Sequence, residues 1–315
     1  MKPLCNRLML LASILLTAGP IAALANGLAC RFEPLSENVY VINGSNVERC
    51  PPQTLLHPVN NPVAIIGDGG VVIVDPGSSE QVGQLVVNRL RLITSRPVVA
   101  IINTHIHGLY WLGNHALKMA YPQARIYAHR QMIQRIEQGE GDYWVSAIGG
   151  RQTIAEVPTE ALDGGEILDL NGVKLSIHHP AHAHTDHDLM IEIIKDKILI
   201  LGGIVVEPEV PSQGVPQDAN FKGQMAATRY AIALNMNLYI PGQGYPQGIA
   251  LPKRSLRFLE ALYSGVEHYY SDGLQDFEIS DKLKVDLVAF QQWYNFDHLG
   301  RVIAEMYLQV EQEQF

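Results

Sequence analysis

Two histidines that directly follow an apolar strand constrain the fold of this 315-residue chain more than any other feature. Residues 98–103 are mainly apolar and β-branched, which predicts a buried strand, and the chain continues as Thr104-His105-Ile106-His107. Side chains at positions i and i+2 of an extended chain point to the same side, so both imidazoles should enter one space. Strand ends open into loops, where binding groups usually lie. The sequence therefore predicts a polar site at the carboxyl end of a buried strand.

A second histidine-rich segment, residues 178–188, follows a predicted strand at residues 173–177. Its histidines are His178, His179, His182, His184 and His187. Taken singly, His178, His179 and His187 are predicted to be solvated loop residues. A His-x-His pair together with one distant histidine favours a metal site instead, because imidazole nitrogens are common zinc ligands.

The N-terminus has the pattern of an exported protein. An apolar segment at residues 8–17 lies between basic residues and an A-x-A cleavage signature at residues 23–25, which predicts a signal peptide, residues 1–25. A membrane anchor is the alternative, but the apolar run is short for a bilayer. A lipoprotein site at Cys30 is disfavoured because the residues before it form a poor lipobox. We expect the mature chain to be periplasmic or secreted.

Removal of the signal peptide leaves 290 of the 315 residues, and loss of Lys2 and Arg7 takes the net charge from −9 to −11. This acidic balance argues against nucleic acid and anionic membranes as partners of the mature chain. Only Cys30 and Cys50 remain after cleavage, and in an oxidising compartment they are predicted to form a disulfide. A thiolate metal ligand is disfavoured, because neither cysteine lies near the histidines in sequence.

Strand and helix patterns alternate through the rest of the chain. The dipeptide Asn171-Gly172 between two apolar runs predicts a tight hairpin. Each half of the chain combines strands with helices, and no linker separates the halves, which predicts one domain with sheet packed on sheet and helices outside. Residues 255–270 and 282–310 are predicted to be helical.

The first histidine segment carries a resemblance to a known family. Residues 104–114, Thr-His-Ile-His, three residues and then Trp-Leu-Gly-Asn, resemble the signature T-H-x-H-x-D-H-x-x-G-N of the metallo-β-lactamase superfamily. Four further landmarks follow the family's order: Val72-Ile73-Val74-Asp75-Pro76-Gly77, Ala183-His184-Thr185-Asp186-His187-Asp188, Leu199-Ile200-Leu201-Gly202-Gly203 and Ile240-Pro241-Gly242-Gln243-Gly244.

The resemblance covers residues 36–245 and implies the αββα four-layer sandwich of that superfamily. On this basis, residues 26–250 are predicted to form the metallo-β-lactamase-like domain. Residues 251–315 are predicted to be a helical C-terminal extension packed on the same domain. That extension, with Trp293 and Tyr294, also resembles an exported subgroup linked to quinoprotein systems in methylotrophs.

The resemblance also implies which residues hold metal. The ligands of the family's first metal are matched by His105, His107 and His184. The four positions that hold the second metal are occupied by Leu109, Tyr110, Gly203 and Gln243. None of these side chains is a good metal ligand at neutral pH, so we expect the second site to be lost and one Zn²⁺ ion to remain.

Four residues are candidates for supporting roles around this metal. Asp75 is predicted to tie a histidine loop by hydrogen bonds, although a turn residue at the start of a helix explains it equally well. Tyr110, Asp186 and Gln243 are candidates for orienting substrate or water, and each is equally well a packing or loop residue. The family's aspartate that orients the nucleophilic water is missing.

Two functions follow from this pattern. The first is an exported mononuclear zinc hydrolase acting on a small ester, lactone or amide. The second is a catalytically inactive binding or accessory protein with a protein partner in the periplasm. Redox chemistry on mononuclear iron ranks behind both, because it usually needs a carboxylate beside two histidines and Leu109 and Gly203 remove the obvious candidates.

Overall fold

A computed structural model describes residues 30–45, 59–150, 152–207, 210, 218 and 220–314. The predicted signal peptide and Cys50 lie outside the described residues. Cys30 takes part in a disulfide, and its pairing with Cys50 stays a prediction. Among the described helices, none combines the length and apolar character needed to cross a bilayer.

The first half of the chain forms a seven-stranded sheet in simple sequential order. Its strands are β1 (Glu33–Pro34), β2 (Val39–Val41), β3 (Val63–Gly67), β4 (Gly70–Val74), β5 (Val98–Ile102), β6 (Arg125–His129) and β7 (Glu160–Leu162). Strands β1 to β4 pair antiparallel, whereas β4 to β7 are parallel. Helix α2 (Glu80–Leu90) makes the crossover between the parallel strands β4 and β5, and Ser79 caps it by accepting a hydrogen bond from the Val82 backbone N–H.

The second half forms a five-stranded sheet in the order β12-β11-β10-β9-β8. Its strands are β8 (Ile167–Leu170), β9 (Val173–His178), β10 (Met190–Ile193), β11 (Ile198–Ile200) and β12 (Leu238–Ile240). The hairpin predicted at Asn171-Gly172 joins β8 and β9, and both residues have positive φ (53° and 91°), as a tight primed turn requires. Strands β11 and β12 are parallel and connected through α7 (Phe221–Ala233).

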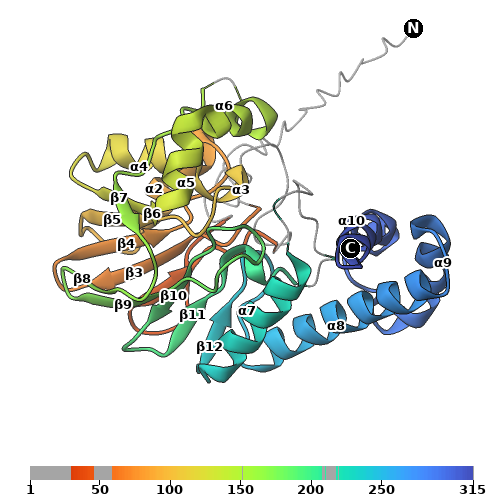
Figure 1. Ribbon diagram of the computed structural model, residues 1–315. Helices are drawn as coiled ribbons and strands as arrows, with labels where there is room; N and C mark the ends of the chain where they lie inside the picture. The colour runs from red at the N-terminus through yellow and green to blue at the C-terminus, as the bar shows by residue number, and fades with distance from the viewer. Residues whose placement is uncertain are drawn as a thin grey trace, which may run out of the picture.

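The two sheets pack face to face, with helices on both outer faces (Figure 1). Buried apolar side chains of both sheets, such as Val72 and Ile191, form the core between them. A second apolar cluster joins the outer face of the first sheet to α2 and α4 (Asn114–Ala120), and a third joins the second sheet to α7. The predicted αββα sandwich is therefore confirmed.

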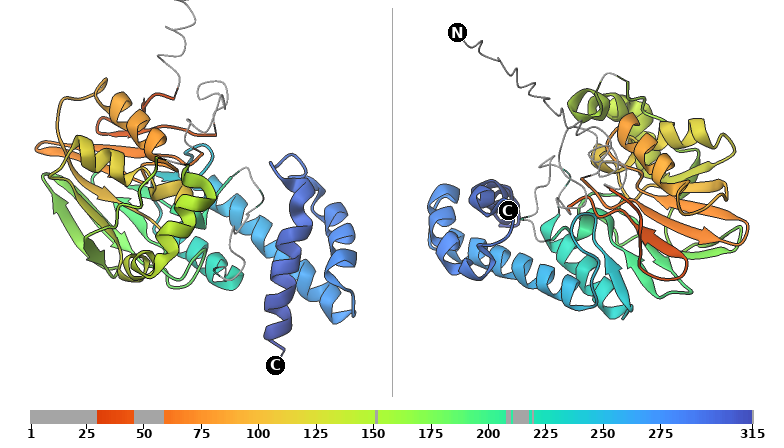
Figure 2. Two further views of the ribbon diagram at one scale, coloured as in Figure 1. Left: turned by 90° about the horizontal axis from the view of Figure 1, so that it is seen from above. Right: turned by 180° about the vertical axis from the view of Figure 1, so that it is seen from behind.

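The C-terminal helices form a unit that extends away from the sandwich (Figure 2). Helix α8 (Ala250–Ser271) contacts α7 and also packs against the two helices that follow it, α9 (Asp276–Asp286) and α10 (Leu299–Gln312). Their shared apolar cluster includes Phe221 and Met225 of α7, which join the unit to the sandwich. The predicted helix over residues 282–310 is interrupted between α9 and α10, where Asn295 adopts a left-handed conformation (φ 61°).

Candidate metal centre

The loops after several strands meet at one edge of the sandwich. Strands β4 and β5 are parallel neighbours, so their carboxyl ends place Asp75 beside Thr104. The Asp75 backbone N–H donates to the Ile102 carbonyl at 3.0 Å, which fixes this junction. Short helix α3 (Gly108–Trp111) begins directly after His107. The indole N–H of Trp111 donates back to the Ile106 carbonyl at 2.6 Å and so closes the loop between the paired histidines and α3.

The second histidine segment lies in the loop between β9 and β10 and is held by a buried carboxylate. Both the backbone N–H and the hydroxyl of Thr185 donate to Asp188 at 2.8 Å. Burial raises the pKa of Asp188 to about 7, against the opposing effect of these hydrogen bonds. The loop thereby presents His184 toward the first segment, with the backbone N–H of Leu189 donating to the Thr104 carbonyl at 2.9 Å.

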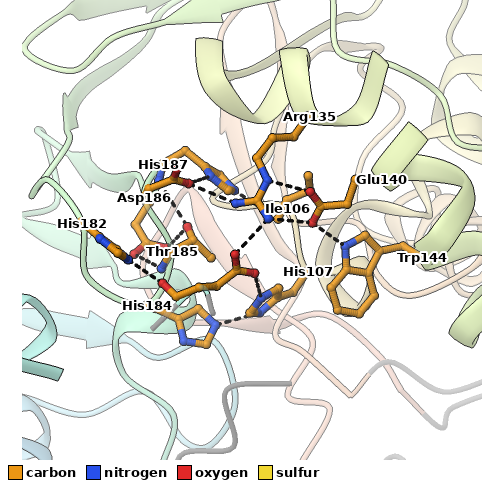
Figure 3. A network of polar contacts seen from close by, with 12 residues as sticks. Ile106, His107, Arg135, Glu140, Trp144, His182, His184, Thr185, Asp186 and His187 are labelled. Atoms are coloured by element: carbon orange, nitrogen blue, oxygen red, sulfur yellow. Dashed lines mark hydrogen bonds and ion pairs between the residues drawn. The ribbon is translucent and has the colours of Figure 1, made fainter. Parts of the chain in front are cut away.

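Three buried histidines converge at this edge. His105, His107 and His184 each offer a ring nitrogen, and these nitrogens all lie within 4.8 Å of one another. The Nε2 atom of His184 lies 2.9 Å from Nδ1 of His107, and the ring of His105 lies 4.9 Å from that of His184 (Figure 3 shows His107 and His184). His184, rather than His182, joins the cluster, as the family register implies.

The donor set fits a divalent metal ion. The side chains of all three residues are nearly inaccessible to solvent, and the buried Nε2 atom of His105 has no hydrogen-bond partner among the described residues. Burial, followed by the neighbouring histidines His184 and His107, lowers the pKa of His105 well below its ordinary value, so its imidazole is neutral at pH 7. Neutral imidazoles with an unpartnered buried nitrogen are what a metal site needs.

A relay of hydrogen bonds sets the orientation of His105. Its Nδ1 lies 2.9 Å from the hydroxyl of Thr104, which in turn donates to Asp75 Oδ2 at 2.8 Å. The Thr104 backbone N–H donates to Asp75 Oδ1 at 2.9 Å. Because the Thr104 hydroxyl donates to Asp75, it accepts the proton of His105 Nδ1, which leaves the Nε2 lone pair for the cluster. Asp75 therefore lies where the sequence predicted a supporting carboxylate.

We expect Asp75 to give the metal-free protein a pH-dependent stability. Burial raises its pKa to about 7, against the lowering effect of the Thr104 hydrogen bonds. Because the folded state binds this proton more tightly than the unfolded state, protonation of Asp75 favours folding. This contribution to the free energy of unfolding is fully present below about pH 4 and is lost as the pH rises through 7. The loss amounts to about 4 kcal/mol at 1.36 kcal/mol per pKa unit. Urea unfolding of the wild type and of Asp75→Asn between pH 4 and 8 measures it: the variant should show the smaller slope, and equal slopes would contradict this account.

His187 contradicts the prediction of a solvated loop residue. Its ring is fully buried, and its Nε2 accepts the backbone N–H of Ile106 at 3.2 Å, while its Nδ1 is bound to Asp186. Burial lowers the pKa of His187, so the ring is neutral, with its Nδ1 proton donated to Asp186. His187 therefore supports the backbone between the two paired histidines. His178 is half-buried at the end of β9 rather than in a loop and lies 3.0 Å from Glu192, and the half-buried His179 lies 2.9 Å from the Asp188 carbonyl.

The four positions that the resemblance assigns to the family's second metal carry no carboxylate and no imidazole: they are Leu109, Tyr110, Gly203 and Gln243. The ring of Tyr110 lies 4.3 Å from that of His105, and its hydroxyl would lie 2.6 Å from a Cβ placed on Gly242. A Cβ on Gly203 would lie 2.6 Å from Nε2 of His184 and even closer to Cδ2. The phenol ring of Tyr110 therefore occupies space at position 110, and the His184 ring lies against position 203. Leu109, at a third position, is half-buried.

The other two candidates for orienting substrate lie to the side of the cluster. Asp186 pairs with Arg135 at 3.1 Å and with His187, and hydrogen bonding from His187 is the main cause that holds the pKa of Asp186 well below its ordinary value. Gln243 is half-buried, and its carbonyl accepts the backbone N–H of Glu207 at 3.1 Å. Among the described contacts, the Asp186 side chain forms ion pairs, whereas Gln243 takes part through its backbone carbonyl.

Sequence reasoning missed a group of residues on the other side of His107. Arg135 ends α5 (Arg130–Arg135), Glu140 ends the π-helical segment Ile136–Glu140, and Trp144 ends α6 (Gly141–Trp144). The Trp144 ring lies 5.2 Å from that of His107, and Asp218 Oδ2 lies 3.3 Å from His107 Nε2. Burial acts to raise the pKa of Asp218, but hydrogen bonds from His107 and Arg135 outweigh it and hold the pKa below its ordinary value. These residues lie outside the family motifs, so no spacing in the sequence pointed to them.

Comparison with known proteins agrees with this geometry. A family profile described as the metallo-beta-lactamase superfamily matches residues 58–262. The curated proteins give no significant match. Among solved structures, a DIM-1 metallo-β-lactamase exposed to ceftazidime is 20% identical, covers 74% of this chain and 97% of its own, and superposes with a TM-score of 0.58.

Two further solved structures show the same fold. A metallo-β-lactamase from Pontibacter korlensis is 16% identical, with coverage of 73% and 98% and a TM-score of 0.57. A metallo-β-lactamase from Hirschia baltica is 21% identical, with the same coverage and a TM-score of 0.56. The family match spans well over half of the chain and includes all three clustered histidines. This chain belongs to the metallo-β-lactamase superfamily.

Proposed function

We propose that the chain is an exported mononuclear zinc hydrolase that cleaves a small ester, lactone or amide. The observation that carries the proposal is the buried convergence of His105, His107 and His184. Three histidine imidazoles match the donor set of catalytic zinc sites, which keep a further position open for water or substrate. When bound, zinc supplies a Lewis acid that polarises a carbonyl oxygen and lowers the pKa of water to about 7.

Residues of the chain prepare this site for one ion. Asp75 and Thr104 hold His105 with its Nε2 toward the cluster, and the rings of Tyr110 and Trp144 flank His105 and His107. The two aromatic rings shield the histidines from bulk water, and electrostatic interactions are stronger where water is excluded. The side chains at the second-metal positions support the proposal of a single ion.

A metal-binding accessory protein is the second candidate. It is favoured by the state of two carboxylates near the clustered histidines, Asp186 and Asp218, which are both ion-paired with Arg135. Hydrogen bonding from His187, with Arg135 adding to it, lowers the pKa of Asp186, and hydrogen bonds from His107 and Arg135 outweigh burial and lower the pKa of Asp218, so both carboxylates are weak proton acceptors. Export is proposed for either function from the N-terminal pattern alone.

We expect one zinc ion per chain. Elemental analysis of zinc-loaded, desalted protein measures the stoichiometry, and a panel of ester, lactone and β-lactam substrates measures hydrolysis. Turnover of nitrocefin should be weak, because efficient hydrolysis in a two-metal site relies on clamping both nucleophile and leaving group. Two ions per chain, or none, would contradict the proposal. One ion without turnover of any substrate would favour the accessory protein.

A further inference from the structure

Arg135 is the centre of an ion-pair network beside the metal-binding histidines (Figure 3 shows Arg135, Glu140 and Asp186). Its Nε donates to Glu140 at 2.6 Å, its Nη1 to Asp186 at 3.1 Å and its Nη2 to Asp218 at 2.9 Å. The guanidinium side chain is 26% exposed, whereas that of Asp218 is only 6% exposed. The buried carboxylate of Asp218 is held in place by its ion pair with Arg135, because leaving a buried carboxylate unpaired costs several kcal/mol.

Asp218 connects this network to one of the clustered histidines. Its Oδ2 lies 3.3 Å from Nε2 of His107, and the opposite ring atom, Nδ1, faces His184 Nε2 at 2.9 Å. The backbone carbonyl of Asp218 is bound in turn by His182 Nε2 at 2.6 Å. A carboxylate accepts only, so His107 carries its proton on Nε2 and turns the Nδ1 lone pair toward the cluster.

A second branch of the same network reaches the backbone between the paired histidines. Arg135 binds Asp186, which accepts the Nδ1 proton of His187, and His187 Nε2 accepts the N–H of Ile106. The network therefore holds both the side chain of His107 and the peptide unit between His105 and Ile106. Trp144, whose indole N–H donates to Glu140 at 3.3 Å, packs against the same histidine ring.

The network is arranged for support rather than for binding an anionic substrate. Three carboxylates surround one guanidinium, so their combined charge is negative and repels anions. Four of the five N–H donors of Arg135 are accounted for by the hydrogen bonds to Glu140, Asp186 and Asp218.

We propose that Asp218 and Arg135 are positioning residues that hold His107 in the tautomer and ring orientation needed for metal binding. The inference rests on the zinc centre proposed above. Partners that accept the second ring N–H of a metal-binding histidine commonly change metal affinity by 10- to 100-fold when they are removed. Asp218 acts directly on His107, and Arg135 acts by fixing Asp218.

Zinc affinity tests the proposal. Competition against a chromophoric chelator, with zinc alone as the probe, should show the zinc Kd of Asp218→Ala raised by about 10- to 100-fold relative to the wild type. Asp218→Asn, which keeps a hydrogen-bond acceptor, should recover part of the loss. Arg135→Met should fall between the wild type and Asp218→Ala. The control is Asp163→Ala, which removes the exposed pair with Arg130 (2.7 Å) and should leave the zinc Kd unchanged.

A second readout separates positioning from a general loss of stability. In the metal-free protein, ¹⁵N NMR of the histidine rings should show His107 protonated on Nε2 in the wild type and a mixture of tautomers in Asp218→Ala. An unchanged zinc Kd together with an unchanged tautomer in Asp218→Ala would overturn the inference while the zinc centre stands. A wild type that binds no zinc would overturn the proposed function and the inference with it.

Discussion

Zinc binding is expected to fall below detection when His184 is replaced by alanine. His184 is one of three ligands in the cluster, and its Nε2 lies 2.9 Å from Nδ1 of His107. Its removal leaves two imidazoles, too few for a closed or catalytic zinc site. Elemental analysis after zinc loading should give no zinc above the background of the metal-free protein. The zinc-dependent rise in Tm should vanish with it, because only a ligand that binds the native state stabilises it.

Two neighbouring histidines make informative comparisons with His184→Ala. His182→Ala should retain one zinc ion, because His182 is exposed and contacts the Asp218 carbonyl rather than the cluster. His187→Ala should also keep the ligands but lower the free energy of unfolding by about 1–3 kcal/mol, because the Ile106 N–H and Asp186 each lose a partner. Full zinc content in His184→Ala would reject the assignment of the third ligand.

Restoring the family's carboxylate by Gly203→Asp is expected to destroy the metal centre rather than create a second site. A Cβ on Gly203 would lie 2.6 Å from Nε2 of His184, well inside the distance that real Cβ atoms keep. The His184 ring must therefore move, and with it a metal ligand. Overpacking of this kind costs about 3 kcal/mol, and burying an unpaired carboxylate adds to the cost. Urea unfolding and zinc content measure the two consequences.

The steric origin of this effect has a direct control. Gly203→Ala introduces the same Cβ without a charge and should also lose zinc. Gly248→Ala adds a Cβ whose nearest neighbour is the Asn237 carbonyl at 3.9 Å, so its stability and zinc content should match the wild type. A Gly203→Asp protein that binds two metal ions would show that His184 can move aside and that the second site was lost through chemistry alone.

Most of the fold could be predicted because short-range patterns in this sequence agree with the tertiary arrangement. Apolar strands such as β5, the Asn171-Gly172 turn and the Ser79 cap act within a few residues and are visible in the sequence. The helical stretch over residues 282–310 was predicted without its interruption near Asn295. The apolar residues of α10 pack in one cluster with those of α8 and α9. The break between α9 and α10 lets α10 reach this cluster, so it depends on contacts between helices that a local sequence pattern does not reveal.

The clustered histidines were predictable from family motifs, whereas the residues that support them were only partly so. Asp75 belongs to a motif, and its contact with Thr104 follows from the pairing of two parallel strands. Arg135 and Asp218 belong to no motif and lie 83 positions apart in the chain. His187 lies in a motif, but its burial depends on the approach of Ile106 from the other histidine segment.

The sequence by itself determined the alternation of strands and helices, the three histidines of the cluster, and the residues at positions 109, 110, 203 and 243, which the resemblance aligns with the family's second-metal ligands. These properties depend on residue identity and local spacing. Only the tertiary structure decided which nitrogen of each ring faces the centre, that the His184 ring crowds Gly203, and that one arginine supports the histidine loop from two sides. A hydrogen bond or a steric conflict depends on distances of a few ångströms between segments far apart in the chain, and those distances are set only when the two sheets and their helices pack together.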